Sequence, residues 1–291
     1  MSAVPDRVVR TVAAPYARAL GLDVAEASTD RVRLALPFVE GNSNPGGALH
    51  GGVAASLVLI GGALVGDATS GEDAVERTTI DASITYLAAA INEGVVAEAR
   101  ALRRGKELTF VEVDVHTDAG KPIARGLTVR RNAPPSSVER VRAAREPVPA
   151  PSDAPPPGFT KLFTTAPFMA RLGLRVVRVE NGEAIVRLPW LPANTDADGT
   201  LHEGALAALA DTTGAMASWS LVPLDPRNKA STPVVHVNVH RAARDEVVVA
   251  HARTLARSDE IFTNAVTVAS EASGTVIATA TVSYRIVVPR D

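Results

Sequence analysis

The feature that most constrains this chain is an internal repeat. The string "ALGLDVAEASTDRVRLALPF" matches "RLGLRVVRVENGEAIVRLPW" further along the chain. His50 matches His202 with a shift of 152 residues, and Ala99 matches Ala252 with a shift of 153. Because the matches stay collinear with only one residue of slippage, chance is a poor explanation, and the sequence indicates a duplicated domain.

A proline-rich segment separates the two copies. Residues 132–158 hold eight prolines and few large apolar side chains, which is typical of an extended linker. We therefore predict a first domain over residues 1–131, a linker over residues 132–158 and a second domain over residues 159–291.

Each copy shows the same order of expected elements. A short helix (16–20 and 168–172) precedes a β-hairpin (24–37 and 176–189), in which apolar and polar residues alternate. A polar loop and a helix beginning at His50 or His202 follow, and at least three more strands complete each copy. Because the helix is apolar on nearly all sides, the sheet must wrap around it. The sequence therefore predicts an α+β layered fold.

Composition excludes several classes of function. The chain has no cysteine, so disulfides, thiolate catalysis and cysteine metal sites are excluded. A net charge of −2 argues against a nucleic-acid binder. The apolar run at residues 51–66 is short for a membrane span and rich in glycine, which favours a buried helix. We expect a cytoplasmic protein with no membrane segment, no cofactor and no metal.

The N-terminus of the helix that follows His50 has groups that suit a catalytic site. Backbone N–H groups at a helix N-terminus are unpaired and partly positive, so they form a natural oxyanion site. Gly51 and Gly52 would let a substrate approach that backbone closely. Asp211 is an acid in the apolar body of the second helix, but it lies about 12 Å along the helix from Glu203, the counterpart of Gly51. An acid at Asp211 would therefore have to act with the helix start of the other copy.

These patterns resemble the hotdog fold, in which a curved antiparallel sheet encloses one central helix. The string "NPGGALHGG" further resembles thioesterases of the phenylacetyl-CoA type. In that family five residues separate an Asn from His-Gly-Gly, and an acid stands nine positions after the His. The resemblance implies a tandem double hotdog that forms a pseudo-dimer within one chain. It also implies an acyl-CoA thioesterase whose site is shared between two copies.

Carried over residue by residue, the resemblance places one complete site between the copies. The Gly51 N–H would polarise the thioester carbonyl, Asn44 would orient the carbonyl or a water, and His50 would cap the helix. Asp211 would serve as nucleophile or general base, a choice the sequence leaves open. Further candidates on the substrate-binding side are Gly52, Thr213 and Ser231, with Thr232 as the alternative to Ser231 for a hydroxyl that positions water.

The second site implied by the duplication lacks the family's elements. Leu59 stands where the acid is expected, and Asp196 replaces the Asn. Glu203 replaces the oxyanion glycine beside His202, which adds negative charge where an oxyanion would form. We therefore expect one live site per chain.

Alternatives remain open at this stage. Asp211 would also suit a structural role, bonded to backbone or to Thr213. An enoyl-CoA hydratase would need an Asp and a His at a spacing that this sequence does not show. A non-catalytic acyl-CoA-binding or assembly protein is the main alternative function, and pairing of two chains into a homodimer is a further possibility. Arg103, Arg104 and Lys106 would either meet CoA phosphates or form a solvated turn.

Overall fold

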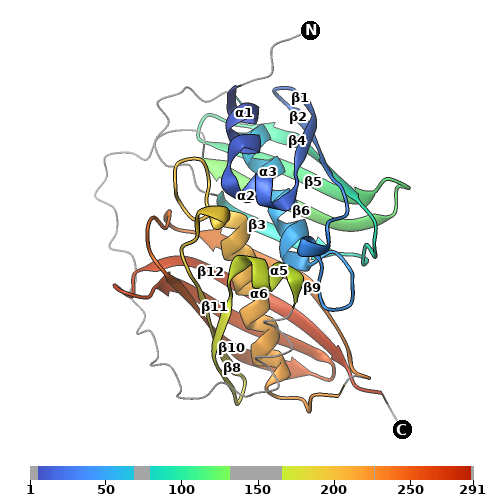
Figure 1. Ribbon diagram of the computed structural model, residues 1–291, viewed down its shortest axis with the longest axis vertical. Helices are drawn as coiled ribbons and strands as arrows, with labels where there is room; N and C mark the ends of the chain where they lie inside the picture. The colour runs from blue at the N-terminus through green and yellow to red at the C-terminus, as the bar shows by residue number, and fades with distance from the viewer. Residues whose placement is uncertain (1–5, 69–78, 132–165, 226, 290–291) are drawn as a thin grey trace.

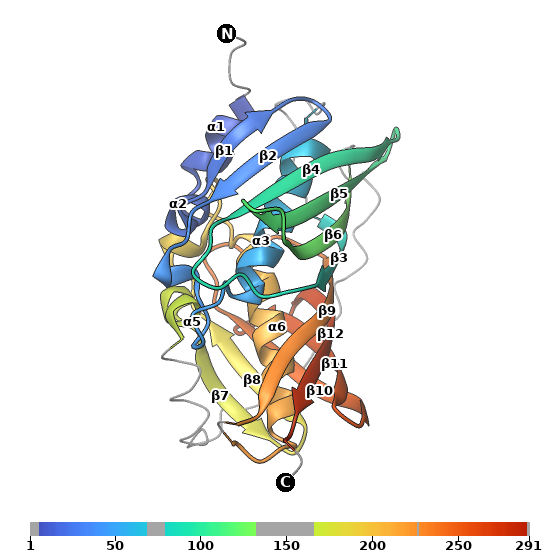
Figure 2. The ribbon, with the colours of Figure 1, turned by 90° about the vertical axis from the view of Figure 1, so that its right-hand side faces the viewer.

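The computed structural model describes residues 6–68, 79–131, 166–225 and 227–289. Two similar halves are visible, each a curved sheet with one long helix on its inner side (Figures 1 and 2). The elements of the first half are α1 (Asp6–Ala13), α2 (Pro15–Leu20), β1 (Asp23–Ala27), β2 (Arg31–Leu36), η1 (Glu40–Asn42), α3 (Gly51–Gly66), β3 (Thr79–Tyr86), β4 (Val95–Arg104), β5 (Leu108–Thr117) and β6 (Pro122–Arg131). Those of the second half are α5 (Pro167–Leu172), β7 (Arg175–Glu180), β8 (Glu183–Leu188), η2 (Pro192–Asn194), α6 (Glu203–Trp219), β9 (Lys229–Val239), β10 (Val248–Ser258), β11 (Ile261–Ser270) and β12 (Val276–Val287).

One antiparallel sheet runs through both halves. Within the described residues its strand order is β1-β2-β4-β5-β6-β3-β9-β12-β11-β10-β8-β7. The halves join where β3 lies beside β9, with Ser83 opposite His236 and Ile84 opposite Val235. The second half repeats the order of the first in reverse, so an approximate twofold axis passes between β3 and β9. The predicted α+β double hotdog is confirmed.

The central helices α3 and α6 are buried on all sides because the sheet wraps them and they also pack on each other. Apart from Gly51 and Ala63, every residue of α3 is buried, and so is every residue of α6 except Glu203. The strands show the matching pattern: buried and partly exposed residues alternate along β5. Helices that are apolar all round therefore form the core of each half, as their sequence requires.

Small residues allow α3 and α6 to pack closely near their N-termini. A Cβ atom on Gly52 would lie 2.5 Å from the Cβ of Ala208, and one on Gly204 would lie 2.4 Å from the Oγ of Ser56. Ser56 is the counterpart of Ala208 in the repeat, so the approximate twofold axis relates the two contacts. Only glycine fits at these two positions without displacing the other helix.

The short helices α2 and α5 pack against the opposite half. The N–H of Tyr16 donates to the carbonyl of Thr195 at 3.0 Å, and the N–H of Phe168 donates to the carbonyl of Ser43 at 3.2 Å. Each aromatic ring then lies against the histidine of the other half: Tyr16 stacks on His202 with centroids 4.4 Å apart. The two halves thereby hold each other's helix-start loops in place.

Two further sequence predictions concern the linker and the membrane. The proline-rich linker over residues 132–158 lies outside the described residues, so the domain boundaries stay a prediction. Among the helices of the described residues, none combines the length and the apolar character that crossing a membrane requires.

Candidate active site

The first candidate site is built on the N-terminal end of α3. The Nδ1 of His50 accepts a hydrogen bond from the Gly52 N–H at 3.0 Å, which makes His50 the N-cap of the helix. Burial, with a smaller effect of the Arg171 charge, lowers the pKa of His50 to about 4. The ring is therefore neutral at pH 7 and its Nε2 carries the proton. His50 fixes the helix start and is poorly suited to take up a proton at neutral pH.

The loop before the helix is held by side-chain amides. The Asn42 side chain donates to the carbonyl of Leu20 at 2.7 Å, and Asn194 makes the same bond to Leu172 at 2.8 Å in the second half. These two residues therefore shape their loops in the same way in both halves. The Oδ1 of Asn44 accepts from two N–H groups of its own loop, those of Gly46 and Ala48, at 2.8 and 3.1 Å. Its amide nitrogen is therefore the end of Asn44 that can donate to another group.

Asp211 lies on α6 and only 5% of its surface is exposed. The hydroxyl of Thr232, on β9, donates to its Oδ1 at 2.7 Å. Burial raises the pKa of Asp211 to about 6, and the Thr232 hydrogen bond opposes that shift. A carboxyl group with this pKa is largely ionised at pH 7 yet remains basic enough to accept a proton.

Asp211 of the second half faces the helix start of the first half. A Cβ atom on Gly51 would lie 3.2 Å from the Oδ2 of Asp211. No acceptor for the Gly51 N–H is found among the described residues. A partly positive helix N-terminus and a carboxylate from the other half therefore share one small space, which a side chain at position 51 would crowd.

Three of the predicted site residues have other surroundings. Ser231 is exposed, and its neighbour Thr232 supplies the hydroxyl on Asp211. Thr213 is fully buried and its hydroxyl donates to the carbonyl of Leu209 on the same helix, so it does not reach the site. Gly52 packs against Ala208 instead of facing a substrate. These corrections follow from strand pleat and helix rotation, which the sequence does not fix to one residue.

Tyr86 directly contacts the helix start that carries Gly51. Its hydroxyl donates to the Gly51 carbonyl at 3.2 Å, and its Cε1 would lie 3.4 Å from a Cβ on Gly51. Burial, and then the charge of Asp211, raise the pKa of Tyr86 well above its ordinary value, so the phenol stays protonated. The sequence does not indicate this contact, because the position of β3 against the α3 terminus has no sequence signature.

The approximate twofold axis creates a second interface between the halves, and its residues are arranged differently. Thr79 and Thr232 each lie four residues before the paired residues Ser83 and His236, so they are equivalent by symmetry. Thr232 binds Asp211, whereas Thr79 donates its N–H, at 2.7 Å, and its hydroxyl to the carboxylate of Glu203.

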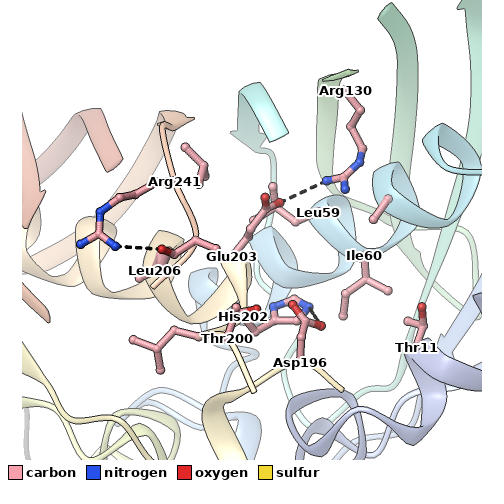
Figure 3. Close-up of a pocket in the computed structure, with 14 residues that line it drawn as sticks. Thr11, Leu59, Ile60, Arg130, Asp196, Thr200, His202, Glu203, Leu206 and Arg241 are labelled. Carbon is pink, nitrogen blue, oxygen red and sulfur yellow. Dashed lines mark hydrogen bonds and ion pairs between the residues drawn. The ribbon is translucent and has the colours of Figure 1, made fainter. Parts of the chain in front are cut away.

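The carboxylate of Glu203 is also paired with an arginine. Arg130 donates to Glu203 at 3.3 Å (Figure 3). It also pairs with Asp67 at 3.1 Å. The side chain of Arg130 is only 4% exposed, so this is a buried ion-pair cluster. Leu59 occupies the helix position of the acid. The second interface thus keeps a carboxylate, but one that comes from the helix start and is already fully paired.

Arg104, one of the three basic residues singled out in the sequence, lies at the other end of α3. Its side chain donates to the carbonyls of Val65 and Gly66 at 3.0 and 3.2 Å, which is the C-terminal end of that helix. That end is about 20 Å from Gly51 along the helix. Arg104 therefore binds helix carbonyls, and a contact of these basic residues with CoA phosphates stays a prediction.

Comparison with known proteins gives the family. The model of the thioesterase superfamily matches residues 46–124 and again residues 198–277, so the chain belongs to this superfamily and carries two copies of its domain. The chain is similar to human acyl-coenzyme A thioesterase 13, at 34% identity over 119 residues, which is 40% of this chain and 84% of the human protein.

Solved structures show the same fold over nearly the full chain. A hot dog fold protein from Alicyclobacillus acidocaldarius is 18% identical, covers 94% of this chain and 98% of its own, and has a TM-score of 0.67. An acyl-CoA thioesterase II from Mycobacterium marinum is 15% identical, with coverages of 92% and 96% and a TM-score of 0.63. At these identities the likeness concerns the fold.

Proposed function

We propose that the protein is an acyl-CoA thioesterase with one working site per chain. The observation that carries the proposal is the distance of 3.2 Å between the Oδ2 of Asp211 and the position of a Cβ on Gly51. It is supported by membership of the thioesterase superfamily and by similarity to human acyl-coenzyme A thioesterase 13.

In the proposed reaction, the thioester carbonyl oxygen accepts a hydrogen bond from the Gly51 N–H, and the helix dipole stabilises the oxyanion that develops there. Asn44 donates to the same carbonyl or to a water. Asp211, oriented by Thr232, either removes a proton from a water that attacks the carbonyl carbon or attacks that carbon itself to form an acyl anhydride that water then hydrolyses. In both routes the C–S bond breaks and the CoA thiolate leaves and takes up a proton. The products are a carboxylic acid and free CoA.

The second interface is proposed to be catalytically silent. Leu59 offers no base, and the paired carboxylate of Glu203 stands where an oxyanion would need a donor. A negative charge at that point would repel the developing oxyanion.

Thiol release from a panel of short, long and aromatic acyl-CoAs tests the proposal. Asp211→Asn should lower kcat/KM by about 10²-fold or more, the range typical for a positioned acid–base group. Asp114→Asn is the matched control. It changes an exposed carboxylate on β5 that pairs with Arg125, and it should leave turnover unchanged. Turnover that survives Asp211→Asn would contradict the mechanism. Binding of acyl-CoA without any turnover by the unmodified protein would support the non-catalytic alternative.

A further inference from the structure

A cavity of about 100 Å³ lies at the second interface, between α3, α6 and the end of β9. Its apolar wall is formed by Leu59, Ile60, Ala63, Leu206 and Val239, and its polar groups include Asp196 and His202 (Figure 3). A single water needs about 10–15 Å³ of such space, so the cavity has room for several waters or for a molecule of a few non-hydrogen atoms.

Most charged groups around the cavity are already paired. Glu203 is bound by Thr79 and Arg130, and Arg130 is shared with Asp67. On the other side, Arg241 pairs with Glu246 through two hydrogen bonds of 2.7 and 3.1 Å. These groups need no ligand to satisfy them.

Two polar groups of the cavity face each other without a direct hydrogen bond. His202 is only 6% exposed, and its Nδ1 accepts the Gly204 N–H at 2.8 Å, so its Nε2 carries a proton to donate. The Nε2 lies 3.8 Å from the Oδ1 of Asp196, too far for a hydrogen bond. The Asp196 side chain is 43% exposed, and among the described residues no donor reaches its carboxylate, so water hydrates it when no ligand is bound.

The distance of 3.8 Å between the His202 Nε2 and the Asp196 Oδ1 favours a ligand with two polar atoms of its own. One bridging oxygen at about 2.9 Å from both atoms would be held at an angle of only about 80°, which is strained for a water or a hydroxyl. The oxygen and nitrogen of a carboxamide are about 2.2 Å apart, so each can form its own hydrogen bond across the 3.8 Å gap. The carbonyl would accept from His202 and the N–H would donate to Asp196.

We propose that the second interface is a binding site for a small neutral carboxamide, whose head group bridges His202 and Asp196 and whose apolar body lies against Leu59 and Val239. The charge around the site gives the selectivity. A carboxylate ligand would face Asp196 and be repelled, whereas an ammonium ion would leave the His202 N–H without an acceptor. The inference does not depend on catalysis at the first site.

The chain itself supplies a variant that closes the cavity. Tyr86 and Val239 each lie three residues beyond the pair Ser83 and His236, so they are equivalent across the twofold axis. At the first site Tyr86 fills the space beside Gly51, whereas the smaller Val239 lines the cavity. Val239→Tyr should therefore fill the cavity, where its ring would meet the Glu203 side chain instead of the glycine that Tyr86 meets in the other half.

Saturation-transfer NMR with propionamide on the full chain tests the proposal. We expect saturable binding with a dissociation constant on the order of 1 mM, as suits a ligand of few atoms. Propionate should give no signal, and n-propylammonium should bind at least about tenfold more weakly, a difference of about 1.4 kcal/mol. Both Val239→Tyr and Asp196→Ala should abolish the propionamide signal, and Asp196→Ala should keep the melting temperature within a few degrees of the unmodified value.

The proposal is overturned if propionamide gives no saturable signal, if the signal survives in both variants, or if propionate binds equally well. Free CoA, whose pantetheine arm contains carboxamides, identifies the source of the ligand. Displacement of propionamide by CoA would assign the site to that arm. A propionamide signal that CoA leaves intact would assign it to a free small amide, and either result supports a carboxamide site.

Discussion

At the scale of single residues, the pKa of Asp211 governs both activity and stability. If the ionised carboxylate is the reactive form, kcat/KM should rise with pH and level off above a midpoint near pH 6. Thr232→Val removes the hydrogen bond that favours the ionised form of Asp211, so it should raise the pKa of Asp211. The rising part of the pH profile, here called the pH limb, should then move to higher pH. Thiol release measured from pH 4.5 to about 8 checks the shift.

Ser231→Ala is the control for that experiment. Ser231 is exposed and adjacent to Thr232, so its loss should leave the pH limb in place. A pH profile that is the same for Thr232→Val and the unmodified protein would contradict the assignment of Thr232 as the residue that positions Asp211.

Ionisation of Asp211 also lowers the stability of the folded protein at neutral pH. Because the folded-state pKa of about 6 lies above the ordinary value of 3.8, the folded state favours the protonated form. The stability contribution of Asp211 is therefore complete below about pH 4 and is lost as the pH rises through 6. Asp211→Asn should raise the free energy of unfolding at pH 7 by up to about 3 kcal/mol, with the gain disappearing near pH 4.

Urea unfolding of Asp211→Asn at pH 7 and pH 4 measures this difference. Asp114→Asn, which changes an exposed ion pair, should alter stability by less than about 1 kcal/mol at either pH. A variant that is less stable than the unmodified protein at pH 7 would show that Asp211 is structural, and that the carboxylate stabilises the fold.

Much of this candidate site can be predicted from the sequence because its motif is local. Asn44, His50 and Gly51 lie within one loop and one helix turn, and the length of α6 predicts that Asp211 faces the other copy. Of the two neighbouring hydroxyls that the sequence offers, Ser231 is exposed and Thr232 binds Asp211, because adjacent residues of a strand face opposite sides. The contact of Tyr86 with Gly51 depends on tertiary packing and has no local signature in the sequence.

At the scale of elements, the packing of α3 against α6 depends on small residues. Gly52→Ala would place a Cβ 2.5 Å from that of Ala208 and 3.0 Å from its Cα, a backbone atom that cannot move freely. We expect a loss of about 1–3 kcal/mol in unfolding free energy, larger than the gain of about 1 kcal/mol in helix propensity.

Gly41→Ala is the matched control, because its Cβ would meet its nearest atom, on Val39, at 4.0 Å. Denaturant unfolding of the two variants should separate them by at least about 1 kcal/mol. Equal stabilities would mean that the helices can move apart without cost. The strands and helices were foreseeable from periodicity, whereas this contact was not, since a glycine in the sequence suits substrate approach and helix packing equally well.

At the scale of the whole molecule, duplication allows the two halves to diverge. In a symmetric dimer, every helix must carry both the acid and the oxyanion glycine. In this chain one helix carries Gly51 with Leu59, and the other carries Glu203 with Asp211, so each interface receives a different combination. The repeat made this asymmetry readable from the sequence, but the binding of Glu203 by Thr79 and Arg130 required the structure.

The shared sheet and the packed central helices predict that the chain unfolds as one unit. Neither half can open without breaking the β3–β9 ladder and exposing the α3–α6 contact. Circular dichroism, tryptophan fluorescence and loss of thiol release should therefore give coincident thermal transitions, and the calorimetric and van't Hoff enthalpies should agree. Asp211→Asn, a change in the second half, should move the circular dichroism and fluorescence transitions to higher temperature together at pH 7. Two separated transitions, of which only one moves, would show instead that the halves unfold independently and that their interface contributes little to stability.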